Sequence, residues 1–305
     1  MKNVILRWSF CLLILSVSYI IFGFRFANKT NDLQNFQGKA IYQSKATMQN
    51  NLEGIDLSEE QKKMISERMN SLLEKTYTLT FNKNISTYKE EEKLSSPQNQ
   101  GGMFLRALGI GSGIYFKNIK EKTYKNETEF FGKSFLIEDD LQQLEWKLTA
   151  ESKKIGNYVC YKATAVKQVD STDFTNFKST NRPIGDNIKK KDSLGNTSLL
   201  SRIEIPKTVE VTAWYTPEIP VSNGPDEYWG LPGLILEVSS GNTTILCSKI
   251  ILNVEHKETI NIPSKGKSVS QAKYNEIVKK KLKEVREKFM SSDRGSNSFF
   301  GGFRG

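Results

Sequence analysis

The hydrophobic and polar positions of this chain alternate with a period of two along most of its length. Leu79 and Phe81 alternate with threonines, and Trp146 and Leu148 alternate with charged or polar neighbours. The same alternation returns from Thr208 and again after the bend at residues 230–233. Because successive side chains of a strand point to opposite faces, this pattern predicts about eight β-strands, mainly antiparallel.

Two segments follow the three- and four-residue spacing of an amphipathic helix instead. The first covers about residues 58–75, after a first strand at 37–48, and Ser58 with Gln61 forms a capping box at its start. The second covers residues 267–290. We expect the apolar stripe of each helix to cover a sheet. Two helices beside many strands predict the α+β class, dominated by a curled antiparallel sheet.

The first 27 residues have the layout of a secretory signal. Lys2 and Arg7 precede an apolar run that ends at Phe24, and the small residue Ala27 follows. The alternative is an uncleaved anchor, because the run of about 17 residues reaches the short limit for crossing a bilayer. No later segment is long and apolar enough to span a membrane. We therefore expect an exported, periplasmic mature chain without a membrane span.

The remainder of the chain divides by composition. We expect one β-rich domain over residues 28–266, in which the polar and aperiodic residues 169–200 form a mobile insertion. The amphipathic helix at 267–290 follows this domain. The last residues, 291–305, are rich in Gly, Ser and Phe, and we expect them to be a disordered tail.

Charge and cysteine content narrow the function. The formal net charge is +10, but the lysines are scattered and no nucleic-acid-binding module accompanies them, so we expect no nucleic acid partner. Cys160 and Cys247 are the cysteines beyond the signal, and in an oxidising compartment they predict one disulfide. Two buried free thiols are the alternative. These cysteines and a single histidine predict no metal site, and we expect no cofactor.

The stretch YWGLPGLILE, residues 228–237, combines glycines and a proline with apolar residues. A phosphate-binding loop would need a helix after the glycines, whereas an alternating β pattern follows here. Glycines allow close backbone approaches, and proline restricts φ. We therefore expect a rigid structural bend that enters a core strand, formed by Gly230, Leu231, Pro232, Gly233, Leu234 and Ile235.

Candidate binding and catalytic residues lie around this bend. Trp214, Tyr228 and Trp229 are the aromatic residues that we hypothesise to form a binding rim. His256 is the single histidine, and its charged surroundings indicate an exposed residue without a catalytic role. Acid–base chemistry is left to the carboxylates that flank the bend, Glu218, Asp226, Glu227 and Glu237. We expect Asp226 and Glu227 to be solvated turn residues and the protein not to be an enzyme.

The motif at the bend also resembles a known family. Residues 230–235 read GLPGLI, the hexapeptide for which the GLPGLI family is named, and Trp146 with the stretch GNYVCYKA at 156–163 is similar to the same family. The resemblance covers roughly residues 38–290, and the chain departs from it in the insertion at 169–200 and in its tail. It implies an exported protein of Gram-negative bacteria, of a family often encoded beside TonB-dependent outer-membrane receptors. The expected sheet also looks like the half-barrel of periplasmic lipoprotein carriers.

These observations support three hypotheses about function. The first is a non-catalytic accessory or binding protein, periplasmic or associated with the outer membrane, whose partner is an outer-membrane or other envelope protein. The second is a carrier of a lipid or a lipidated protein, which requires an apolar ligand cavity. The third is a hydrolase that uses the carboxylates around the bend.

Overall fold

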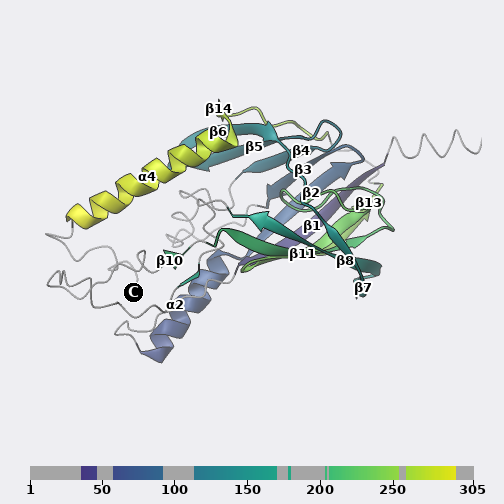
Figure 1. Cartoon of the computed structure of the whole chain (residues 1–305), viewed down its shortest axis with the longest axis horizontal. Coiled ribbons are helices and arrows are strands. Elements are labelled where there is room, and N and C mark those ends of the chain that lie inside the picture. Colours follow the sequence, from purple (N-terminus) through teal and green to yellow (C-terminus); the bar gives the residue numbers. More distant parts are fainter. Residues whose placement is uncertain are drawn as a thin grey trace, which may run out of the picture.

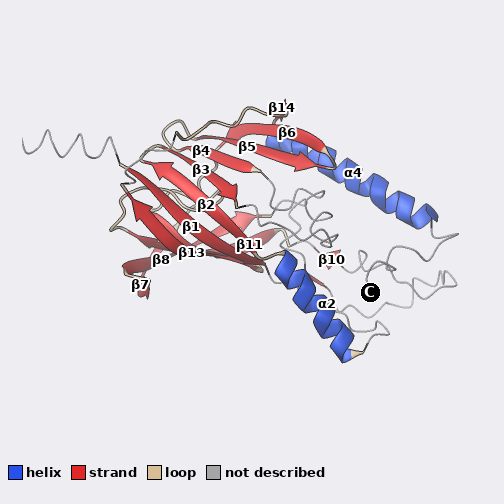
Figure 2. Ribbon diagram, turned by 180° about the vertical axis from the view of Figure 1, so that it is seen from behind, coloured by secondary structure: helices blue, strands red, loops and turns tan. Residues whose placement is uncertain are grey.

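The computed structural model describes residues 36–46, 58–91, 113–169, 178–179, 203–204, 206–253 and 259–292. The expected signal, most of the expected insertion at 169–200, His256 and the tail from residue 293 lie outside the described residues. Within them, one large sheet curls around a core, and two helices project from the same end of it (Figures 1 and 2).

The main sheet has twelve strands in the order β14-β6-β5-β4-β3-β2-β1-β13-β12-β11-β8-β7. Neighbours are antiparallel, except for the parallel pair β14 and β6. Its strands are β1 (Gln37–Ala46), β2 (Lys75–Asn82), β3 (Ile85–Glu90), β4 (Ile114–Asn118), β5 (Thr123–Phe130), β6 (Lys133–Asp140), β7 (Lys147–Ile155), β8 (Tyr158–Gln168), β11 (Thr208–Thr216), β12 (Leu234–Ser240), β13 (Thr243–Leu252) and β14 (Lys267–Val269). The short strands β9 (Lys178–Ser179) and β10 (Ile203–Glu204) pair separately.

The first strand joins the two halves of the sheet. On one side β1 pairs with β2, and the sheet continues through β3, β4 and β5 to β6. On the other side β1 pairs with β13, which leads through β12, β11 and β8 to β7. The main core therefore contains residues from both halves, including Tyr42, Phe81, Val211, Leu236 and Val238.

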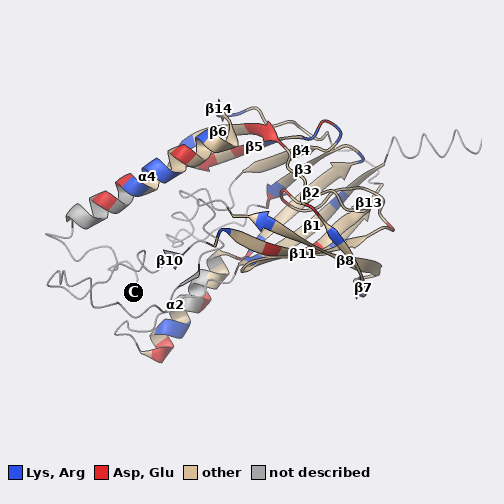
Figure 3. Ribbon diagram, in the orientation of Figure 1, with Lys and Arg blue, Asp and Glu red and all other residues tan. Residues whose placement is uncertain are grey.

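Two helices complete the described part of the chain, α2 (Glu59–Leu72) and α4 (Gln271–Ser292). The predicted capping box is formed at the start of α2: the Ser58 N–H donates to Gln61 Oε1 at 3.0 Å, and the Gln61 N–H donates to Ser58 Oγ at 3.2 Å. Val278 near the start of α4 packs against Phe130 and Phe135 of the sheet. Charged residues of both signs lie along both helices (Figure 3).

The predicted α+β class is wrong, because the described structure is dominated by one large, mainly antiparallel sheet of twelve strands. The helices attach at its margins and do not form a layer over it (Figure 1). Residues 267–269, which we expected to begin the C-terminal helix, pair with β6 as strand β14. Amphipathic spacing identifies a helix with an apolar face, but it does not show how much of that face a sheet covers. No helix in the described ranges is long and apolar enough to cross a membrane.

The predicted disulfide is also absent from the described structure. Cys160 on β8 and Cys247 on β13 are both free and buried. Two strands, β11 and β12, lie between β8 and β13 in the sheet, whereas a disulfide requires Cα atoms about 4.4–6.8 Å apart. The alternative of two buried thiols describes this structure.

Candidate functional site

The bend between β11 and β12 is shaped by contacts that exclude larger side chains. A Cβ atom on Gly233 would lie 2.1 Å from the carbonyl oxygen of Thr216, and a Cβ on Gly224 would lie 2.8 Å from Cβ of Ile235. Gly230 differs, because it has a φ of +94° as well as a close contact with Gln143. β12 begins at Leu234, directly after these glycines. The chain therefore passes through the bend with its backbone in contact with neighbouring backbone.

A buried lysine on β4 holds the loop that precedes the bend. Lys117 is 0% exposed, and its Nζ donates to the carbonyl oxygens of Gly224 at 2.7 Å, Asp226 at 2.5 Å and Tyr228 at 3.2 Å. Burial lowers the pKa of Lys117 to about 7, while the negative charges of Asp226 and Glu227 favour its protonated form. Three ammonium donors meet three carbonyl acceptors, which anchors the loop to the sheet.

Further hydrogen bonds connect the loop to strands that are distant in sequence. Asn223 is fully buried, and its Oδ1 accepts from Ser86 Oγ of β3 at 3.3 Å and from the Gly224 N–H at 2.9 Å. The Asn223 carbonyl accepts from the Ile235 N–H at 2.9 Å. The Ile235 carbonyl in turn accepts from Tyr42 Oη of β1 at 2.7 Å. The bend is therefore fixed to β1, β3 and β4.

Two tryptophans link the bend to the segment before β7. The indole N–H of Trp229 donates to the carbonyl of Gln142 at 2.9 Å, and the indole N–H of Trp146 donates to the carbonyl of Trp229 at 2.8 Å. Residues 142–146 are thereby held beside residues 229–232. Because each indole N–H has a backbone partner, both rings are fixed in position.

The three aromatic residues that we hypothesised to form a rim do not gather on the surface. Tyr228 and Trp229 are 5% and 6% exposed, and both pack in core clusters. Trp214 is half-buried on β11, with Nζ of Lys153 4.3 Å from its ring centroid. Tyr228 and Trp229 therefore support the bend from inside, and Lys153 covers Trp214.

An open depression lies over the two linked segments. Its volume is about 440 Å³, and it is lined by Gln143, Leu144, Glu145, Trp146, Leu148, Gly230, Leu231 and Pro232. Leu231 is 1% exposed and belongs to the core, whereas Leu148 is 58% exposed. Three residues of the bend thus form one wall of the depression.

The carboxylates near the bend have partners within the scaffold. Glu218 Oε1 accepts from the Val159 N–H at 2.9 Å, and Glu237 pairs with Lys153 at 2.7 Å. Glu227 pairs with Lys167 of β8. Burial alone would lower the pKa of Lys167, but the charge and hydrogen bond of Glu227, together with the charges of Tyr228 and Asp226, outweigh burial and raise it. The remaining carboxylate, Asp226, has a left-handed backbone with a φ of 49°.

By residue type, the two buried cysteines are also candidates for nucleophilic chemistry or metal binding. Burial raises the pKa of Cys160 to about 11 and that of Cys247 to about 12, so both thiols are protonated at neutral pH. No group of three or more His, Cys, Asp or Glu residues within the described ranges could hold a metal ion.

Sequence reasoning identified the bend but missed both Lys117 and the depression. The signal for Lys117 was a charged residue inside the strand IYFKN, at residues 114–118, whose other members are mostly apolar. The two segments that line the depression are 84 residues apart in the sequence, counted from Trp146 to Gly230. Nothing in the sequence indicated that these segments lie side by side.

Part of this region matches a model of a known protein family. Residues 146–237 match the Porph_ging family, described as a protein of unknown function. The match begins at Trp146 and ends within β12, so it contains the bend and most of the lining of the depression. The family match does not itself carry the GLPGLI name. No curated protein matches the chain.

Several solved structures match this chain at low identity and low structural similarity. A structure of PNGF-II has a TM-score of 0.42 and 12% identity over 79% of this chain, and the chain spans only 33% of PNGF-II. An uncharacterized conserved protein from Thermus thermophilus has a TM-score of 0.33 and 6% identity, covering 82% of this chain and 99% of the other. LprF from Mycobacterium bovis has a TM-score of 0.24 and 11% identity, covering 77% and 93%. Similarities at this level assign neither a fold nor a function.

Proposed function

We propose that this chain is an exported, non-catalytic binding protein of the Gram-negative cell envelope, which contacts a partner at the depression beside its glycine–proline bend. Its partner is an outer-membrane or other envelope protein. The hexapeptide at residues 230–235 supports membership of the GLPGLI family, and the N-terminal pattern of residues 1–27 supports export.

The observation that carries the proposal is an apolar surface at the depression, next to a bend that hydrogen bonds hold in one conformation. The bend is held by the three bonds of Lys117, by the bond from the Trp146 indole to the Trp229 carbonyl, and by the bond from the Trp229 indole to the Gln142 carbonyl. Leu148 is exposed and lines the depression together with residues of the bend. A rigid surface loses little conformational entropy on binding, so such a surface favours recognition.

The environment of the reactive groups supports a non-catalytic role. Glu218, Glu227 and Glu237 each bond to a partner in the scaffold. The two thiols have raised pKa values because they are buried, whereas a nucleophilic cysteine has a lowered one. Within the described residues, the charged groups around the bend therefore act in holding it.

The depression favours a protein partner over a lipid cargo. It is open to solvent and bounded by Gln143 and Glu145 as well as by leucines, whereas an acyl chain requires an enclosed apolar cavity. The TonB-dependent receptor systems that the GLPGLI resemblance implies are the first envelope proteins to test as partners.

A surface substitution tests this function directly. We expect Leu148→Asp to abolish recovery of the partner in crosslinked purification from native envelopes, because it places a charge in the depression. Leu148 is 58% exposed, so the variant should fold normally. Val166→Asp is the matched control, because Val166 is 65% exposed on β8 and does not line the depression. Equal recovery with both variants would reject the depression as the binding site.

A further inference from the structure

The last strand of the sheet, β7, pairs on one side only. Its described partner is β8, and no further strand follows it in the sheet order of the described residues. The free backbone groups of an edge strand are a template for pairing with another extended chain. Most side chains of β7 are exposed.

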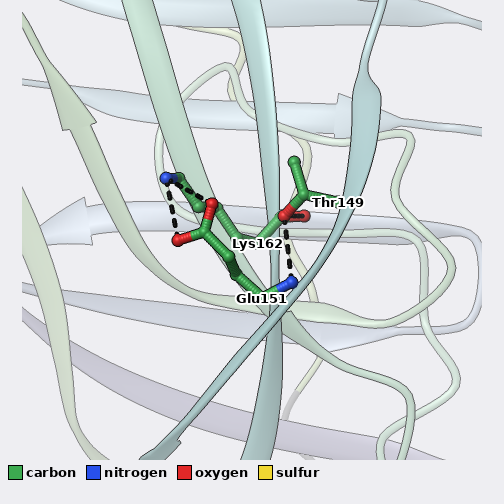
Figure 4. Close-up of polar contacts among 3 residues, drawn as sticks. All are labelled: Thr149, Glu151 and Lys162. Atoms are coloured by element: carbon green, nitrogen blue, oxygen red, sulfur yellow. Dashed lines mark hydrogen bonds and ion pairs between the residues drawn. The ribbon is translucent and has the colours of Figure 1, made fainter.

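An irregularity in the middle of β7 is held in place by its neighbour. The register with β8 shifts between Leu148 and Ser152. Within this interval Thr149 Oγ1 donates to the carbonyl of Lys162 at 3.2 Å, and Lys162 Nζ contacts both carboxylate oxygens of Glu151 at 2.9 and 3.1 Å (Figure 4). Regular pairing resumes from Ser152 to Ile155. The edge therefore has two regularly paired residues, Lys147 and Leu148, before a fixed bulge and four, Ser152 to Ile155, after it.

The first regular stretch leads directly into the depression. β7 begins at Lys147, next to Trp146, and Leu148 belongs both to the strand and to the lining. An extended segment that added to this edge would have alternate side chains facing the depression, as in other cases of β-strand addition. The depression and the edge thus form one continuous surface.

The charges along β7 indicate which kind of extended segment could pair with its free edge. β7 contains Lys147, Lys153 and Lys154 but a single acidic residue, Glu151, and Glu151 is paired with Lys162. Lys153 is paired with Glu237, while Lys147 and Lys154 are exposed. Parallel, in-register pairing of β7 with β7 of a second copy would place each lysine beside its own counterpart, and like charges on paired strands are destabilising. Lys147 and Lys154 instead favour a segment with carboxylates beside the strand, while Glu145 in the lining of the depression favours an uncharged side chain there.

We propose that the free edge of β7 and the adjoining depression bind an extended acidic segment of a partner protein, with one apolar side chain in the depression. The segment adds a thirteenth strand next to β7, and its carboxylates lie near Lys147 and Lys154. This inference rests on the proposed binding function and names the chemistry of the partner.

Selection from a random dodecapeptide library displayed on phage, against the purified full-length chain, tests the inference. We expect enriched peptides to contain an apolar residue next to alternating acidic residues. The best peptide, synthesised with a fluorescent label, should bind roughly tenfold more weakly to Lys154→Glu than to the unchanged chain. Lys133→Glu is the matched control, because Lys133 is an exposed lysine on β6, far from β7 in the sheet order.

A backbone-methylated form of the same peptide separates strand addition from pocket binding. Methyl groups on alternate amides remove ladder hydrogen bonds but keep every side chain, so we expect them to abolish binding. Equal affinity of both forms, enrichment of peptides without acidic residues, or a dimer that Lys154→Glu dissociates in light scattering would each overturn the inference. If no acidic peptide binds while Leu148→Asp still loses the envelope partner, the proposed function stands and this inference fails.

Discussion

At the scale of single residues, the most informative side chain is a lysine without solvent exposure. A buried ammonium group is costly unless its donors are satisfied, and Lys117 satisfies them with three carbonyls of one loop. The same bonds hold the backbone of residues 224–228 against β4. One side chain thus secures the loop that leads to the bend.

Replacement of this lysine should destabilise the whole chain. We expect Lys117→Met to lower the free energy of unfolding by about 3 kcal/mol, because three buried carbonyls lose their donor. Urea denaturation followed by tryptophan fluorescence measures the change. Lys125→Met on β5 is the control, since Lys125 is 38% exposed and forms a surface ion pair with Glu138. Equal decreases in the free energy of unfolding of both variants would show that the buried hydrogen bonds of Lys117 stabilise the chain no more than a surface ion pair does.

The pH dependence of stability reports the protonation of the same residue. Burial lowers the pKa of Lys117 from its ordinary value of 10.5 to about 7, so between these values the unfolded chain binds more protons than the folded one. The free energy of unfolding, relative to Lys117→Met, should therefore rise from pH 7 to pH 10, at up to about 1.4 kcal/mol per pH unit. Denaturant midpoints across this range measure it. A difference that does not change with pH would mean that the carbonyls keep the pKa near its ordinary value.

At the scale of elements, the bend between β11 and β12 depends on close backbone contact. Gly233 approaches the Thr216 carbonyl so closely that a Cβ would lie 2.1 Å from the oxygen. That oxygen belongs to the main chain and cannot rotate away as a side chain could. The end of β11 and the start of β12 must therefore separate if Gly233 carries a side chain.

An alanine at this position is expected to disrupt the bend. Gly233→Ala should lower the free energy of unfolding by about 3 kcal/mol or more, because the clash displaces two core strands. Gly156→Ala serves as the control: Gly156 has a φ of +58° but open space around it, so it should cost only about 1 kcal/mol. Thermal unfolding of both variants compares them, and a smaller loss for Gly233→Ala would contradict the steric argument.

At the scale of the whole molecule, one N-terminal strand unites two halves of the sheet. β1 pairs with β2 and with β13, and the bonds of Lys117 and Asn223 add contacts between β3, β4 and the loop before β12. Neither half has a complete core without the other, because the main cluster takes Phe81 from one half and Leu236 from the other. The two halves should therefore fold together.

Comparison of two spectroscopic probes tests this cooperativity. The fluorescence of Trp146 and Trp214 reports mainly the half that contains β7 to β13, and that of Trp229 reports its packing against Tyr124 and Ile137 of the other half. Far-ultraviolet circular dichroism reports the strands of both halves. We expect coincident midpoints in urea, as in a two-state transition. Two separate midpoints would show that the halves unfold independently.

Sequence periodicity predicted individual strands, the capping box at Ser58 and the β-strand that follows the bend, because these depend on neighbours along the chain. It overestimated the helical contribution, since the apolar stripe of α4 does not reveal how little of the sheet it covers. The cysteine count led us to predict a disulfide between Cys160 and Cys247. This prediction was wrong because a count does not show that two strands of the sheet lie between these residues.

By itself the sequence determined the local geometry of this protein: which segments extend, where the chain turns, and that glycines and a proline make a stiff bend at residues 230–233. Only the tertiary structure decided that Trp229 is an interior residue, that Lys117 holds the loop, and that residues 143–148 meet the bend in a depression. The physical reason is the distance along the chain over which each interaction acts. Dihedral preferences and alternation act between near neighbours, whereas burial, carbonyl partners and cavities arise when a curled sheet brings distant strands together.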